Sequence, residues 1–405
     1  MSTILMLILG SVYAWSFFQK LIVDQYSWSN TRVAWSFSIA ILMLGISAAW
    51  GGANLKKYGA QKLALIGVSL WSVAFMLGGL AFYYQNSVLL IFGFGFIGGV
   101  GLGLGYVTPV ITAAKWFPEK KGLVTGMVIM GFGLGALLLS KVIAPFFLNL
   151  YANSLTCTFL SIGGVYLILG LLSAYFVVEP ESSPNTQKDL DKTPNDYIFL
   201  LLSKQFVAIW IIFFINIVAG IMLISFQSSM IQDLFLLYGT SYSPLQLTSY
   251  GATLIAVSSV FNGIGRFFWV SISDRMGRIQ TFRFILATQI IVFVLLNFVS
   301  NPIVFGALVC VVLLGYGGGF GTMPSFVADI FTDKHMSHIY GLLLTAWSCA
   351  GIVGPQIAAY FKDTNPERAS FFSFLFAAVL LAVGLLLSFL VKIKPIITEN
   401  NVDAR

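Results

Sequence analysis

Charged residues are scarce in this chain. Only 9% of its 405 residues are Asp, Glu, Lys or Arg, whereas 58% are hydrophobic. A typical soluble domain has about 25% charged residues. The chain therefore has too few charges to coat a soluble globule, and most of its surface must face lipid.

Other features are missing as well. The three cysteines, Cys157, Cys310 and Cys349, all fall inside apolar segments, which excludes a disulfide framework. No Lys or Arg precedes the first apolar run, so the charged start of a signal peptide is absent. No nucleophile and base occur together in the apolar segments. We expect no enzymatic activity, no metal site and no cofactor.

Long apolar runs are what the chain has in abundance. A bilayer core of about 30 Å needs roughly 20 apolar residues per helix. Continuous runs without alternation favour helices over a membrane barrel. The sequence therefore predicts an all-α membrane protein with twelve transmembrane helices, approximately at 3–22, 33–53, 62–83, 87–113, 122–147, 157–178, 205–232, 246–271, 281–299, 303–327, 339–361 and 369–391.

The net charge of +7 reflects topology rather than nucleic-acid binding. If loops alternate between the two sides, one side collects almost all the basic residues. The other side has only Lys20, Arg32, Lys362 and Arg368. Because basic loops stay in the cytoplasm, both termini are expected there. Compact loops favour the cytoplasmic (inner) membrane of a bacterium.

A polar stretch at 179–196 divides the helices into six and six. We expect an N-terminal bundle at 1–178, a cytoplasmic central loop at 179–204, a C-terminal bundle at 205–392 and a cytoplasmic tail at 393–405. Gly59, Phe117 and Pro109 have counterparts about 215 residues later, which indicates a duplicated six-helix unit. Two such bundles related by a pseudo-twofold axis place a substrate site near the midplane between them.

Several short motifs then resemble a known family. The loop S-D-R-M-G-R at 273–278 is similar to the D-R-x-G-R loop of the major facilitator superfamily, although the first-half counterpart has Lys56 where an acidic residue is usual. Within that superfamily the chain most resembles the oxalate–formate antiporter family. This likeness lies in GSVYAWS, KWFPEKKG, PSFVADIF and IYG, which begin at residues 10, 115, 324 and 339. It implies a secondary transporter with a rocking, alternating-access mechanism.

Depth arithmetic singles out Arg266. A helix rises 1.5 Å per residue, so Arg266 lies about 12 Å inside the loop residue Asp274, near the bilayer centre. An arginine there is costly without a partner, and no carboxylate is predicted at its depth. Its planar fork suits a carboxylate, so we expect the substrate to be the partner. The same arithmetic places aromatic residues in this layer: Tyr13, Tyr106, Tyr316, Phe320 and Trp347.

The resemblance implies substrate-binding roles for Arg266 and these aromatics. Oxalate carriers of the family have a helix-11 lysine where this chain has Trp347, so a dicarboxylate would leave one charge uncompensated. We therefore predict a small monocarboxylate such as pyruvate, lactate or formate. Related monocarboxylate carriers have an aspartate where this chain has Asn262, which we also assign to the site. Proton symport, antiport and facilitated diffusion stay open.

Other charged residues have secondary expected roles. Asp274, Arg275, Arg278 and Asp329 are candidates for cytoplasmic gating. Two membrane-flanking charges, Lys141 and Asp233, are possible coupling groups, although both also fit an interfacial position.

Alternatives to monocarboxylate transport are oxalate/formate exchange, amino-acid or drug export, and a non-transporting receptor. The G-x-G-x-x-G run at 93–98 lies in a membrane helix and does not predict a nucleotide site. The expected partners are the lipid bilayer, the carboxylate and possible coupling protons, with a monomeric carrier and no nucleic acid.

Overall fold

The computed structural model describes residues 1–117, 121–180, 203–237 and 242–390, without the side chains at 56, 121–123, 328 and 332–338. In these residues, twelve helical segments are long and apolar enough to cross a membrane. The chain is a multi-pass, all-helical membrane protein, as the apolar segments predict. The predicted central loop at 179–204 and tail at 393–405 lie almost wholly outside the described residues, and the domain limits stay predictions.

The first half of the chain, up to residue 180, supplies six spans. In chain order its elements are α1 (Ser2–Gly10), η1 (Ser11–Ala14), α2 (Trp15–Tyr26), α3 (Asn30–Tyr58), α4 (Ala60–Tyr83), α5 (Ser87–Leu90), η2 (Ile91–Ile97), α6 (Gly98–Trp116), α7 (Lys121–Leu138), η4 (Leu139–Ile143), α8 (Ala144–Leu150) and α9 (Leu155–Tyr175).

The second half, from residue 203, supplies the other six spans. Its elements are α11 (Lys204–Leu237), α12 (Pro244–Met276), α13 (Arg278–Leu296), α14 (Pro302–Leu343), α15 (Thr345–Thr364), η6 (Pro366–Arg368) and α16 (Ala369–Leu390). The helix α14 continues well past the predicted end of its span at 327. Its helical backbone includes the predicted loop before the next span and ends at Leu343.

Short polar residues fix where several helices begin. The side chains of Ser29, Asn86, Ser154 and Asn301 accept hydrogen bonds from the first backbone N–H groups of the helices that follow. Ser243 and Gln246 form a reciprocal capping box at the start of α12. Such caps satisfy N–H groups that have no partner inside the helix.

Two glycines show the duplication in the backbone itself. Gly59 joins α3 to α4 with a φ of 78°, and Gly277 joins α12 to α13 with a φ of 87°. Both ψ angles are close to 149°. Side chains rarely tolerate this positive-φ conformation, so the same turn explains the glycine at both positions of the sequence repeat.

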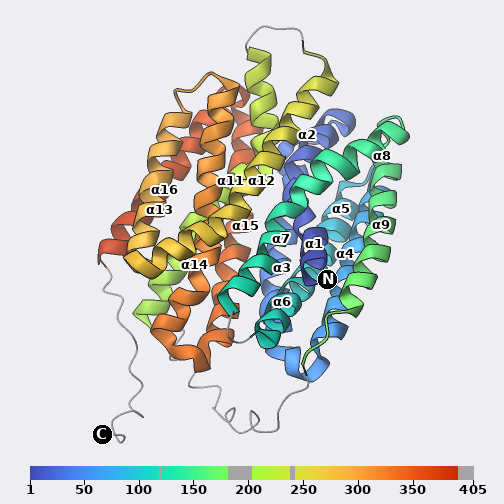
Figure 1. The fold of residues 1–405 in the computed structure, drawn as a ribbon. Coiled ribbons are helices and arrows are strands. Elements are labelled where there is room, and N and C mark those ends of the chain that lie inside the picture. The colour runs from blue at the N-terminus through green and yellow to red at the C-terminus, as the bar shows by residue number, and fades with distance from the viewer. Residues whose placement is uncertain (118–120, 181–202, 238–241, 391–405) are drawn as a thin grey trace, which may run out of the picture.

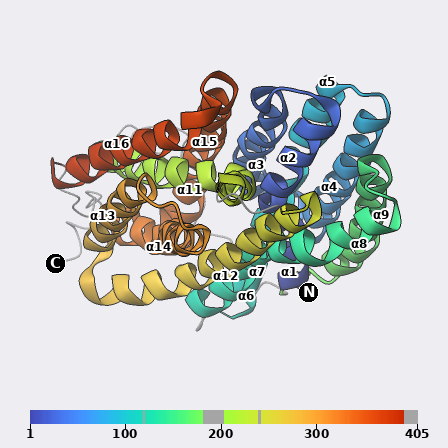
Figure 2. The same cartoon turned by 90° about the horizontal axis from the view of Figure 1, so that it is seen from above.

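The two halves form two bundles that lie side by side (Figures 1 and 2). We call the end where α9 finishes and α11 begins the inner end, because the positive-inside pattern predicts that it faces the cytoplasm. The opposite end, where α3 begins and α15 finishes, is the outer end. Across the interface, α3 packs against α15 and α7 packs against α12.

Small residues bring the halves close together. A Cβ added at Gly45 on α3 would lie 2.0 Å from the Ser348 side-chain oxygen on α15. On α7, a Cβ at Gly133 would lie 3.4 Å from the backbone of Gly263 on α12. The absence of a side chain at Gly45 therefore permits the contact between these helices, since a Cβ there would overlap Ser348.

Candidate functional site

Arg266 lies on α12, in the middle of the protein, with 3% of its surface exposed. The helix is pressed against α14 at this level. A Cβ at Gly321 would lie 2.4 Å from the Arg266 carbonyl oxygen, and one at Gly317 would lie 2.0 Å from that of Asn262. Glycines on α14 therefore allow close packing against the part of α12 that carries Arg266 and Asn262, which lie one helical turn apart.

The Arg266 guanidinium has no protein counter-ion among the described residues. Its Nε and Nη1 groups are buried and make no hydrogen bond there. The guanidinium carbon lies 5.5 Å from the centre of the Phe320 ring, a cation–π contact. Its positive charge also acts on the hydroxyl groups of four tyrosines: Tyr13, Tyr106, Tyr316 and Tyr340.

The aromatic residues predicted for this depth do come together. Trp347 on α15 is at the centre, with ring centroids 4.8 Å from Phe320, 5.6 Å from Tyr106 and 6.4 Å from Tyr13. The Tyr316 ring lies 5.1 Å from that of Phe320. We call these rings, with Phe132, the aromatic layer: Tyr13, Tyr106, Phe132, Tyr316, Phe320 and Trp347.

Phe132 was not predicted from the sequence. It lies on α7, fully buried, with its ring 5.2 Å from both Tyr13 and Tyr106. Phe213 on α11 similarly contacts Phe320 from outside the layer at 5.1 Å. Depth counting does not find either residue by itself, because it does not say which face of a helix points inward.

Three polar atoms in or beside the layer make no hydrogen bond of good geometry to the described residues, although Arg266 lies near the first and Tyr316 near the second. They are the Tyr106 hydroxyl, the Trp347 indole nitrogen and the Asn262 side-chain oxygen. The Tyr13 and Tyr316 hydroxyls, in contrast, bond to each other at 2.7 Å and so join the two halves. Because buried polar groups are nearly always bonded, the donors next to Arg266 are candidates for binding a polar ligand.

The four predicted gating residues lie together at the inner end, within the second half. Arg278 forms ion pairs with Asp274 and Asp329, the latter at 3.0 Å. This joins the end of α12 to α14 through the first residue of α13. Arg275 is exposed. The described contacts of this cluster hold helix ends of one half together, and a role in gating stays a prediction.

Lys141 and Asp233, the possible coupling groups, lie away from Arg266. The Lys141 ammonium on η4 donates to the Ser249 carbonyl of α12 at 3.2 Å. Asp233, near the end of α11, pairs with Lys362 at 2.7 Å. Both therefore have protein partners close to the outer end.

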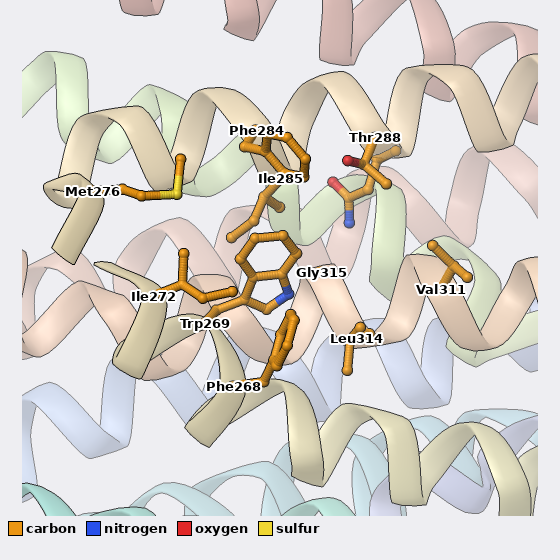
Figure 3. Close-up of a pocket in the computed structure, with 11 residues that line it drawn as sticks. Phe268, Trp269, Ile272, Met276, Phe284, Ile285, Thr288, Val311, Leu314 and Gly315 are labelled. Atoms are coloured by element: carbon orange, nitrogen blue, oxygen red, sulfur yellow. The ribbon is translucent and has the colours of Figure 1, made fainter. Parts of the chain in front are cut away.

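A groove in the described residues lies elsewhere, between α12, α13 and α14 (Figure 3). It has a volume of about 400 Å³ and an almost entirely apolar lining that includes Phe268, Trp269 and Phe284. Phe268 and Phe284 are about half exposed on a membrane-spanning surface. This groove faces lipid and does not include Arg266, whose surroundings are closed by the aromatic layer.

Comparison with known proteins agrees with this architecture. The family model of the Major Facilitator Superfamily matches residues 1–355 and again 236–402. The chain belongs to the major facilitator superfamily. It is therefore a membrane transporter of that superfamily, with the fold and the two-bundle arrangement that the sequence motifs predict.

Individual relatives of this superfamily member are distant in sequence. The oxalate:formate antiporter of Oxalobacter formigenes is 25% identical over 358 residues, which cover 87% of this chain and 81% of the relative. Apicoplast pyruvate carrier 1 of Toxoplasma gondii is 27% identical, covering 76% and 66%. The crystal structure of a D-xylose-proton symporter superposes with a TM-score of 0.74 at 16% identity, covering 97% and 96%, and shows the fold alone.

Proposed function

We propose that this superfamily member carries a small organic monocarboxylate across the cytoplasmic membrane by alternating access. One observation supports this most directly: the buried Arg266 has two nitrogens without a hydrogen-bond partner among the described residues. A buried charge without a partner is strongly destabilising. A carboxylate matches the guanidinium fork with two parallel hydrogen bonds and would remove this cost.

A single negative charge fits the layer better than two. Arg266 is the one charged group that acts on the tyrosine hydroxyls of the layer among the described residues. Trp347 offers a neutral indole N–H beside it. A second carboxylate would therefore enter a low-dielectric site without a counter-charge, which is costly.

Each residue then has a distinct task. Arg266 binds the carboxylate, and the Tyr106 hydroxyl and the Trp347 indole donate further hydrogen bonds. The rings of the layer exclude water and surround a short apolar substituent. The Tyr13–Tyr316 bond ties the halves together and must break when they separate, so closure of the layer and movement of the halves are linked.

The relatives support the chemical class, since one is named for oxalate and formate and another for pyruvate. Oxalate/formate exchange is the second candidate, favoured by the first of these relatives. This exchange would require Arg266 alone to balance the two charges of oxalate, because the Trp347 indole beside it carries no charge.

Uptake into proteoliposomes tests the proposal. Labelled pyruvate, lactate, formate and oxalate are supplied to native protein and to Arg266→Gln at two external pH values. We expect saturable monocarboxylate uptake that falls about 30-fold or more in the variant, since losing one partner of a buried charge pair costs about 2–5 kcal/mol. Stimulation by an inward proton gradient would identify symport.

Two further variants control this experiment. Arg266→Lys keeps the charge but loses the fork, so partial activity is expected. Arg368→Gln removes an exposed arginine on η6 and should leave uptake unchanged. Normal uptake by Arg266→Gln, or transport of neutral or cationic solutes such as amino acids or drugs instead, would refute the carboxylate proposal. Preference for oxalate would favour the exchange candidate.

A further inference from the structure

Polar contacts between the two halves are distributed unevenly along the membrane normal. In the midplane layer, Tyr13 bonds to Tyr316, and the Ser348 hydroxyl donates to the Leu42 carbonyl. The other described hydrogen bonds between the halves lie toward the outer end. They join Gln356 to Ser38, Lys141 to Ser249, and Asp363 to Asn30 and Thr31.

The Asp363 contact is the most extensive of these. One carboxylate oxygen accepts from the Asn30 backbone N–H at 2.9 Å and from its side-chain amide at 3.1 Å. The other oxygen accepts from the Thr31 backbone N–H at 2.8 Å. Asp363 is on α15 in the second half, whereas Asn30 and Thr31 open α3 in the first half.

The location of these donors explains why a carboxylate binds there. The first N–H groups of a helix have no intrahelical acceptor, and the helix dipole favours a negative charge at this end. Ser29 accepts from the Arg32 N–H only. Asp363 therefore completes the cap of α3 from the opposite half, and the cap is lost whenever α3 and α15 separate at the outer end.

The other charged residues near Asp363 do not replace it as the link between the two halves. Lys362, its neighbour in sequence, is held by Asp233 of the same half at 2.7 Å. On α2, Lys20 pairs with Asp24. Arg32, Glu367 and Arg368 are exposed at the same end. The described ion pairs of this end thus stay within one half, and Asp363 is the carboxylate that joins the two.

We infer that Asp363 is a gating residue that holds the outer end of the carrier closed by capping α3 across the two halves. This role concerns alternating access and does not depend on which solute is carried. Opening toward the outer side breaks all three hydrogen bonds, so their strength biases the carrier toward its outward-closed states.

Thiol accessibility tests this inference directly. Ser38 is buried on α3, facing α15, about 12 Å deeper than Asn30 at the helical rise per residue. Ser38→Cys, in a background without Cys157, Cys310 and Cys349, reports opening of the outer end in lipid nanodiscs. Adding Asp363→Ala should raise the labelling rate by a water-soluble maleimide about fivefold, the effect of losing a helix cap.

Matched variants separate the cap from general charge effects. Asp363→Asn keeps one acceptor and should give a smaller increase, and Glu367→Gln, which removes a negative charge at the same end, should give none. Equal labelling rates in the native, Asp363→Ala and Glu367→Gln proteins would overturn the inference. Labelling needs no substrate, so its outcome is separate from that of the uptake experiment.

Cross-linking gives a second measurement if Asp363→Ala is poorly folded. Oxidation of the Asn30→Cys, Asp363→Cys pair should lock the outer end, stop transport of whichever solute the native protein carries, and be reversed by reductant. Full transport by the cross-linked protein would show that this contact does not open in the transport cycle and would refute the gating role.

Discussion

Two arginines only twelve positions apart have opposite surroundings. Arg278, at the inner end, pairs with Asp274 and Asp329 and also donates to the Ser273 hydroxyl. Arg266, in the middle of the same half, is more deeply buried and has no hydrogen bond from its Nε or Nη1 to the described residues. Arg266, for which burial of the charge costs more free energy, thus has fewer hydrogen-bond partners than Arg278.

The difference fits the proposal that Arg278 is a structural cation and Arg266 a binding cation. Arg278 joins the end of α12 and the start of α13 to α14, and it can contribute to stability at a partly exposed site. We expect Arg266 to lower stability, because its charge is removed from water without a counter-ion among the described residues. Its presence beside the aromatic layer fits the proposed role, in which its partner is a substrate that binds and is released.

The strongest test of this comparison is to measure the free energy of unfolding of Arg266→Gln and of Arg278→Gln. Arg266→Gln should raise the free energy of unfolding by about 2 kcal/mol, since a charge at the bilayer centre costs about 3 kcal/mol. Arg278→Gln should lower it by about 1 kcal/mol, as expected for partly exposed ion pairs. Thermal unfolding in a single detergent gives both values.

Substrate addition supplies the control for that measurement. A carboxylate should stabilise the native protein and Arg278→Gln, but it should not stabilise Arg266→Gln. If Arg266→Gln is instead several kcal/mol less stable than native protein, then Arg266 is a structural residue like Arg278 and the comparison fails.

A carboxylate beside Arg266 would make it resemble Arg278. In Asn262→Asp, the new side chain lies one helical turn from the guanidinium and should pair with it near neutral pH. We expect the KM for the monocarboxylate to rise about tenfold at pH 7.5, since substrate and side chain compete for one cation. Pairing with Arg266 keeps the new carboxylate ionised, so the rise in KM should persist between pH 7.5 and pH 5.5.

The measurement is the pH profile of KM in native protein and Asn262→Asp. An unchanged KM in Asn262→Asp at both pH values would show that the new carboxylate does not compete with substrate for Arg266. That result would separate Asn262 from the anion-binding site.

The smallest expected effect concerns the neutral donor in the layer. Trp347→Phe keeps a ring but removes the indole N–H, which should lower uptake efficiency about threefold to tenfold, the value of one hydrogen bond. Trp269→Phe is the matched control. It removes another buried, unpaired indole N–H, but in the lipid-facing groove (Figure 3). Equal effects of the two variants would argue against a specific role for Trp347.

Much of the fold and part of the layer could be predicted because they depend on local properties of the chain. Apolar length located the twelve spans. The fixed rise of a helix placed Tyr13, Tyr106, Tyr316 and Trp347 at the depth of Arg266, and the structure brings their rings together. Their roles in binding stay predictions.

The remaining features depend on helix rotation and on distant pairing. Depth alone does not say which face of α7 points inward, so Phe132 was missed. Asp363 contacts residues more than 330 positions away, and nothing in its own segment marks it as different from Glu367. The gating cluster was found from a motif, but its pairing within one half required coordinates.

The bond between Tyr13 and Tyr316 bears on the kinetics of the proposed carrier. These hydroxyls bridge the two halves at 2.7 Å while Arg266 is unpaired within the closed layer. A carrier that reorients without cargo must bring a bare guanidinium through this closed arrangement, whereas a loaded carrier brings a neutral pair. The loaded form should cross faster, so exchange of internal for external solute should outpace net flux in either direction.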